Sequence, residues 1–105
     1  MQKVKKALVK ARNLIKKGWT KKEYSRNKYG HAVKVDNQNA CKYCVLGAFY
    51  KAANCTPEDT NEVYNHMVSH FQNSTGIVDI IGYNDDKSTK KEDVIKLFNK
   101  TIKEY

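Results

Sequence analysis

The stretch Ala40–Ala53, ACKYCVLGAFYKAA, holds two of the three cysteines and the densest run of apolar and small residues in the chain. A glycine inside a helix costs about 1 kcal/mol relative to alanine, so Gly47 indicates that another segment crosses closely at that turn. The stretch predicts a central helix that is buried on most sides and capped by Asn37 or Asn39. Spacings of three and four place six residues on one face of that helix, namely Cys41, Cys44, Val45, Ala48, Phe49 and Ala52.

Length and composition predict one domain, residues 1–105, around a single core. No apolar run reaches the roughly 20 residues that span a bilayer, and the N-terminus lacks the apolar segment of a secretory signal. Three cysteines do not make a complete set of disulfides. Together these features predict a cytoplasmic protein with reduced thiols and no membrane span.

The chain carries 20 Lys and Arg against 11 Asp and Glu, a formal charge of +9. Such an excess favours an anionic partner, which is nucleic acid, an acidic protein surface or a phosphorylated ligand. A lysine-rich, solvated surface with no partner is an equally good interpretation of the composition alone.

Amphipathic patterns predict further helices on both sides of the central one. The first has the core face Val4, Ala7, Leu8, Ala11, Leu14 and Ile15, with Gly18 as its stop and Trp19 as a hydrophobic anchor. Another helix begins with Thr56 as its N-cap and Pro57 in its first helical position. It runs through Val63, Tyr64, Met67, Val68 and Phe71, and it ends near Gly76. The last begins with a capping box of Thr89 and Glu92, and its core face holds Val94, Leu97 or Phe98, Ile102 and Tyr105.

Three shorter segments are less regular. Residues 31–36 alternate enough for a short strand or an extended arm. Residues 77–83 are an apolar run that suits a helical turn or a strand, and residues 84–88 form a turn. The predicted fold class is therefore a mainly α, compact bundle of four to five helices with one short β-hairpin or extended arm.

The cysteines and histidines offer several chemistries. Cys41 and Cys44, with Cys55 and His66, His70 or His31, could hold tetrahedral zinc, but the second half lacks the usual spacing. A redox dithiol or a Cys–His nucleophile is also open, although no surrounding pattern requires either. Small core cysteines remain the simplest interpretation, so the sequence predicts no cofactor.

A series of short motifs is spread along the whole chain. Ala7-Leu8 through Ile15 is followed by Trp19, then by Arg26-Asn27 with Gly30, by Cys44–Phe49, and by Tyr83-Asn84-Asp85 before a closing helix over Glu92–Ile102. In these features the chain resembles a family of small uncharacterised domains of bacterial and phage genomes. The family more typically has Trp in place of Tyr83 and Asp near Asn27, and it generally lacks Cys41. The resemblance implies a compact, mainly helical domain. It carries no information about activity.

Two functions fit these observations. The first is a small binding or regulatory protein, of a phage acting on host machinery, that holds its partner through Lys5, Lys6, Lys10, Lys16, Lys17, Lys21, Lys22, Arg26 and Lys28. The alternative is an enzyme or a ligand pocket around Cys44, Arg26, Asn84 and Asp85, the four candidate reactive positions that the resemblance links. Each of these four residues also has a structural explanation, so the sequence favours binding over catalysis.

Overall fold

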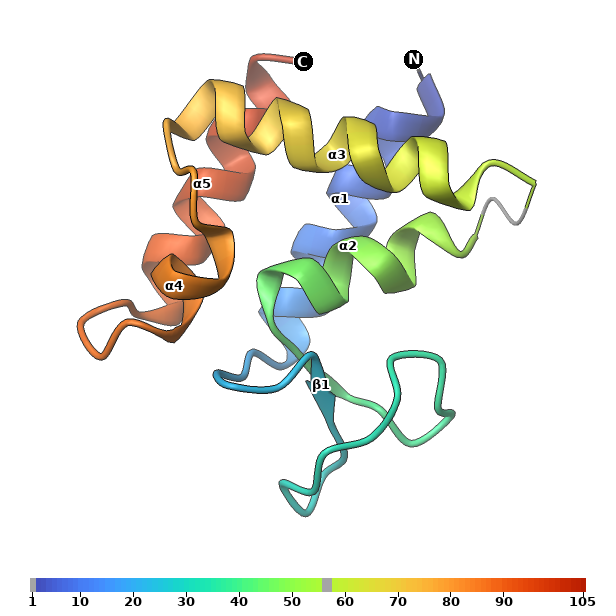
Figure 1. Cartoon of the computed structure of the whole chain (residues 1–105), viewed down its shortest axis with the longest axis vertical. Coiled ribbons are helices and arrows are strands. Elements are labelled where there is room, and N and C mark those ends of the chain that lie inside the picture. Colours follow the sequence, from blue (N-terminus) through green and yellow to red (C-terminus); the bar gives the residue numbers. More distant parts are fainter. Residues whose placement is uncertain (1, 56–57) are drawn as a thin grey trace.

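The computed structural model describes residues 2–55 and 58–105, which form five helices and one short antiparallel pair of strands (Figure 1). The elements in order are α1 Gln2–Lys17, β1 Ser25–Arg26, β2 Lys42–Tyr43, α2 Val45–Ala53, α3 Thr60–Thr75, α4 Ile80–Asp85 and α5 Lys91–Lys103. The mainly α fold class with a short β-hairpin is confirmed. No helix in these ranges is long and apolar enough to cross a membrane.

Three phenylalanine rings form the centre of the core. Phe49 of α2, Phe71 of α3 and Phe98 of α5 lie with their ring centroids 5.5 Å apart in each pair, and all three are fully buried. Tilted and edge-to-face pairs of this kind add about 0.5–1.5 kcal/mol each beyond the burial of area. Helix α1 closes the core with the predicted apolar face, whose buried members are Val4, Ala7, Leu8, Ala11 and Ile15.

The central helix is shorter than predicted, because it begins only at Val45. The backbone before it is bonded to other segments: Cys41 N–H donates to the Arg26 carbonyl (2.9 Å) and Cys44 N–H to the Tyr24 carbonyl (3.1 Å). Cys41 therefore does not lie on the helical face. The predicted cap was also wrong, since the Cys44 sulfur, rather than an asparagine, accepts from the Gly47 N–H (3.3 Å).

The strands lie on either side of the segment that was expected to be extended. Ser25 pairs with Tyr43 and Arg26 with Lys42, whereas residues 31–36 contribute only an isolated bridge from Ala32 to Arg26. The two-residue strands β1 and β2 close the loop between them and join it to the start of α2, and this loop lies below the helices in Figure 1.

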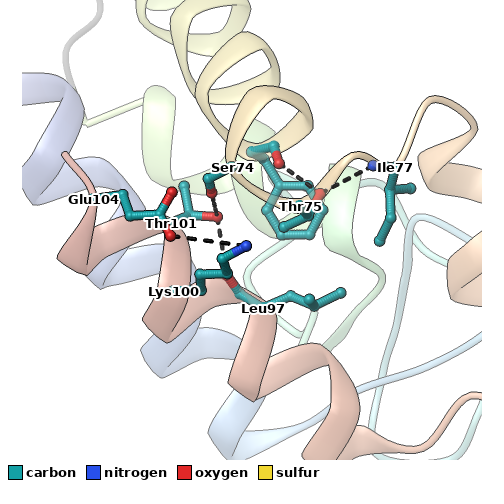
Figure 2. Close-up of polar contacts among 8 residues, drawn as sticks. Ser74, Thr75, Ile77, Leu97, Lys100, Thr101 and Glu104 are labelled. Atoms are coloured by element: carbon teal, nitrogen blue, oxygen red, sulfur yellow. Dashed lines mark hydrogen bonds and ion pairs between the residues drawn. The ribbon is translucent and has the colours of Figure 1, made fainter.

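Hydroxyl groups tie the end of α3 to α5 (Figure 2). Ser74 donates to Thr101 (2.9 Å), and Thr101, 1% exposed, donates to the Leu97 carbonyl (2.9 Å). The Thr75 hydroxyl accepts from the Ile77 N–H (3.2 Å) as the chain leaves the helix. The predicted stop at Gly76 is confirmed, because this residue adopts the left-handed conformation (φ 76°) that glycine tolerates best.

The remaining boundaries differ by a few residues from the prediction. Thr56 and Pro57 lie outside the described residues, and α3 begins at Thr60 after the N-cap Asp59. Residues 80–85 form helix α4, so Asn84 and Asp85 end a helix rather than start a turn. The first turn of α5 is capped one residue later than predicted, because the Asp93 carboxylate accepts from the Lys90 N–H (3.0 Å).

Candidate functional site

Asn84 is the polar centre of the site and is 1% exposed. Its carbonyl oxygen accepts from the Trp19 indole N–H (2.8 Å) and from the Val45 backbone N–H (3.1 Å). Its amide nitrogen donates to the Thr20 carbonyl (3.1 Å) and to Oδ1 of Asp85 (3.0 Å). One amide side chain thus joins the segment after α1, the start of α2 and the end of α4, and its hydrogen-bonding capacity is filled.

Asp85 continues this network to the surface. The same Oδ1 accepts from the Lys22 backbone N–H (2.8 Å), which holds Lys22 at φ 70°. A positive φ at a residue other than glycine costs about 1–3 kcal/mol, so the bond to Asp85 offsets local strain. The carboxylate is therefore a positioning group for the 19–26 loop.

Cys44 lies beside this network, and its thiol is a poor nucleophile. The residue is 7% exposed, and burial raises the pKa of the thiol. The negative charge of Asp85 acts in the same direction, while the N–H groups at the start of α2 partly oppose it. A thiol with a raised pKa is protonated at neutral pH, and only the thiolate attacks an electrophile.

Arg26 is bonded to the loop that surrounds it. Its guanidinium donates to the Thr20 hydroxyl (2.8 Å), the Gly30 carbonyl (2.9 Å) and the Lys21 carbonyl (3.2 Å). Since Thr20 also accepts from Asn84, Arg26 joins the network only through that residue. It does not line the cavity that Cys44 faces.

The structure brings together three of the four predicted site residues. Cys44, Asn84 and Asp85 line a cavity of about 180 Å³, whose other walls include Tyr24, Leu46, Ile80 and Ile81. The cavity is mainly apolar, and on its wall the amide of Asn84 and Oδ1 of Asp85 already have partners within the chain. We call Trp19, Arg26, Asn84 and Asp85 the Asn84 network; Cys44 lies beside it.

The model of a family described as "Family of unknown function (DUF6197)" matches residues 1–104. The chain belongs to this family. This confirms the resemblance to a family of small uncharacterised domains. The comparison with curated proteins and the comparison with solved structures gave no match. The positions that carried the resemblance, Trp19, Arg26, Cys44, Asn84 and Asp85, lie in or beside the Asn84 network, so this member of DUF6197 uses them to hold its fold.

The predicted basic residues divide into two groups. Those of α1 lie on its solvent side, and the described contacts leave the ammonium groups of Lys5, Lys6, Lys16 and Lys17 without a hydrogen bond or ion pair. We call these four residues and Lys10 the α1 basic face, although the Lys10 ammonium contacts the Cys55 sulfur (2.5 Å).

The basic residues of the loop are partly used within the chain. The Lys21 ammonium donates to the Asp86 carbonyl (2.5 Å) and lies 5.3 Å from the centre of the Trp19 ring. Lys28 lies 5.1 Å from the centre of the Tyr29 ring, and Lys22 is exposed beside the small cavity. With Lys21 and Arg26 bonded to carbonyl and hydroxyl groups of the chain, the loop offers fewer unbonded cations than its sequence suggests.

The residues considered as zinc ligands do not come together. Cys44 and Cys55 lie at opposite ends of α2, and a nine-residue helix separates them by about 13 Å. His66 is an exposed residue of α3 whose Nε2 lies 3.9 Å from Glu62. Within residues 2–55 and 58–105, no three His, Cys, Asp or Glu side chains are placed to hold a metal ion. The cysteines are free thiols, with Cys41 and Cys55 exposed.

A second and larger cavity, about 820 Å³, was missed in the sequence. It lies between the 23–36 segment, α2 and α3, and Tyr50, Asn61, Tyr64 and Asn65 line it. The available signal was the pair of asparagines four residues apart, which places two amides on one side of a helix. That pair carried no chemical motif, so it pointed to no function.

Proposed function

We propose that this protein is a small cytoplasmic binding or regulatory protein, phage-encoded and acting on host machinery, that holds nucleic acid on the α1 basic face. The observation that carries the proposal is charge. Helix α1 contains no acidic residue, and four of its ammonium groups have no partner in the described structure. Unpaired ammonium groups on a rigid helix are available for phosphate contacts without breaking existing bonds.

The spacing of these lysines suits an extended polyanion. Lys5 and Lys16 are eleven residues apart, as are Lys6 and Lys17, so each pair spans about 16 Å along α1. A duplex carries one negative charge per about 1.7 Å of its axis, so the same length presents about ten phosphate charges. The helix can therefore make several phosphate contacts at once.

The Asn84 network supports a binding role rather than catalysis there. Its amide is fully bonded within the chain, and Oδ1 of Asp85 and three N–H groups of Arg26 also have partners there. Burial raises the pKa of the neighbouring Cys44 thiol, which disfavours the thiolate. A catalytic site usually exposes groups whose pKa suits proton transfer or nucleophilic attack. The Asn84 network and Cys44 do not expose such groups.

Binding of short DNA and RNA at several salt concentrations tests the proposal. Affinity should fall linearly in a plot of log K against log salt, with a slope of about −3 to −4 for four phosphate contacts. The double variant Lys16→Glu/Lys17→Glu should weaken binding and reduce the slope by about 2. The matched control is Lys96→Glu/Lys103→Glu on α5, which changes the net charge equally at two exposed lysines.

If both double variants weaken binding equally, net charge rather than the α1 basic face is responsible, and the proposal fails. Absence of DNA and RNA binding at low salt would also overturn it. Capture of an acidic protein that depends on Lys16 and Lys17 would then support the other anionic partner.

A second candidate function is a ligand pocket, or an enzyme, at the small cavity. The convergence of Cys44, Asn84 and Asp85 on about 180 Å³ favours it. A ligand there would shield Cys44 from thiol reagents and leave the exposed Cys41 and Cys55 reactive. Equal labelling of Cys44 with and without a bound compound would reject that compound as an occupant.

A further inference from the structure

The larger cavity differs from the small one in the state of its polar groups. In the described structure the side chains of Asn61 and Asn65 make no hydrogen bond. The charged groups of Glu23, Lys34 and Asp36, which also line the cavity, make no ion pair. All five of these residues are exposed, so water solvates their polar groups in the free chain and a ligand can bond to them without breaking a bond of the fold. A cavity of this size, whose lining combines apolar and aromatic side chains with a few such polar groups, is typical of a small-molecule site.

Three tyrosines from separate segments meet at this cavity. Tyr24 precedes β1, Tyr50 lies on α2 and Tyr64 on α3. Tyr64 packs edge-on against Tyr50, with their ring centroids 6.0 Å apart, and thereby fixes that ring. Tyr24 and Tyr50 are 55% and 45% exposed and are not part of the core. Two exposed tyrosines therefore line the cavity, and one of them, Tyr50, is packed against the third tyrosine.

The charge and shape of the lining select the ligand. The lining holds two carboxylates, Glu23 and Asp36, against the single ammonium of Lys34, in a chain of formal charge +9. This balance does not favour a phosphate group. The apolar part of the wall, Val33, Val35 and Leu46, favours a flat ring over a saccharide with hydroxyl groups on every edge.

We infer that the larger cavity binds a nucleoside. The base stacks on the exposed rings of Tyr24 and Tyr50, as bases do on aromatic side chains in single-strand binding proteins. The amides of Asn61 and Asn65 hydrogen-bond the edge of the base, and a side-chain amide pairs with adenine through two bonds. Carboxylates such as Asp36 and Glu23 accept from ribose hydroxyls. The volume, about 820 Å³, is within the range of small-molecule sites.

This inference is independent of the α1 basic face. Titration of the full chain with adenosine, followed by calorimetry or by amide chemical shifts, tests it. Tyr24→Ala and Asn65→Ala should each raise the Kd for adenosine by about fivefold or more, since stacking and amide pairing contribute on that scale. Tyr24→Phe keeps the ring and should bind within about twofold of the unmodified protein.

Matched controls come from the same chain. Tyr29 is 72% exposed and does not line the cavity, and Asn73 is an exposed residue of α3 outside it. Tyr29→Ala and Asn73→Ala should leave the Kd unchanged, and Lys16→Glu/Lys17→Glu should do the same. Circular dichroism of each variant establishes that it folds, and Tyr24→Phe gives a binding test that preserves packing.

Four results would overturn the inference. The first is no binding of adenosine, guanosine, cytidine or uridine at millimolar concentration. The second is equal loss in Tyr24→Ala and Tyr29→Ala. The third is binding of glucose, but of no nucleoside, that depends on Tyr24. The fourth is binding of adenosine monophosphate alone, abolished in Lys16→Glu/Lys17→Glu, which would place recognition on the α1 basic face.

Discussion

The indole N–H of Trp19 donates a 2.8 Å hydrogen bond to the side-chain oxygen of Asn84, a residue 65 positions later in the chain. The same oxygen accepts from the first N–H of α2, at Val45. Through this pair the end of α1, the start of α2 and the short helix α4 are held at one point. The bond therefore places the elements that form the small cavity.

Replacement of Asn84 by alanine should strongly destabilise the protein. The change leaves the Trp19 and Val45 N–H groups and the Thr20 carbonyl without their partner. Each buried polar group that loses its bond costs about 1–3 kcal/mol, so we expect a loss of about 3 kcal/mol or more in the free energy of unfolding. Urea denaturation measures it, and Asn73→Ala on the surface of α3 is the control. A loss below about 1 kcal/mol would show that water replaces these bonds.

Gly47→Ala tests the close approach of the chain to α2. Helix propensity alone predicts a gain of about 1 kcal/mol from this change. The structure predicts the opposite sign, because a Cβ at this position would meet the backbone oxygen of Tyr24 at 2.0 Å. We expect a net loss of about 1–3 kcal/mol, the usual cost of forcing atoms into a packed site. Thermal unfolding of Gly47→Ala beside Ser69→Ala, an exposed helical site on α3, distinguishes the two outcomes.

Cys44 should make stability depend on pH in the alkaline range. Burial raises the pKa of its thiol in the folded chain, whereas the unfolded thiol ionises near its ordinary pKa of about 8.5. Above that pH the folded state binds more protons than the unfolded state, so the free energy of unfolding falls as pH rises. The contribution is complete below the unfolded pKa and is lost as pH rises through the folded one.

Cys44→Ser is the matched variant, because serine keeps an N-cap acceptor and does not titrate in this range. Its free energy of unfolding should change less between pH 7.5 and 9.5 than that of the unmodified chain, with the pH values chosen about the thiol pKa. Parallel pH curves for the two proteins would show that Cys44 contributes nothing to the dependence. Burial also raises the pKa of Tyr43, Tyr64 and Tyr83, but both proteins contain these tyrosines, so their contribution cancels in the comparison.

Arg26→Lys should loosen the loop before and after β1. A lysine cannot reproduce the three bonds that the guanidinium donates to Thr20, Lys21 and Gly30. We expect a loss of about 1–2 kcal/mol and faster hydrogen exchange at the Lys22 N–H, which depends on the position of this loop. Arg12→Lys, at a guanidinium that reaches Asn99 on the helix surface, should have little effect. Unchanged exchange at Lys22 in Arg26→Lys would contradict the assigned role.

Residues close in sequence determined the helices. The apolar stripes from Val4 to Ile15 and from Val63 to Phe71 are amphipathic at the helical period, and Gly76 ends α3 through its own backbone freedom. Periodicity at 77–83 could not separate helix from strand. Gly47 correctly indicated a close crossing, but it could not say that the crossing segment is Tyr24.

Only the tertiary structure decided where α2 begins and which polar side chains form hydrogen bonds within the fold. Cys41 follows the helical spacing, yet its N–H bonds the Arg26 carbonyl, and a long-range sheet contact overrides local periodicity. Asn84 and Asn65 look alike in the sequence, but folding fills the hydrogen bonds of Asn84 and leaves the Asn65 side chain open at a cavity. A helical period records which face is apolar, whereas hydrogen-bond partners tens of residues apart depend on how the elements pack.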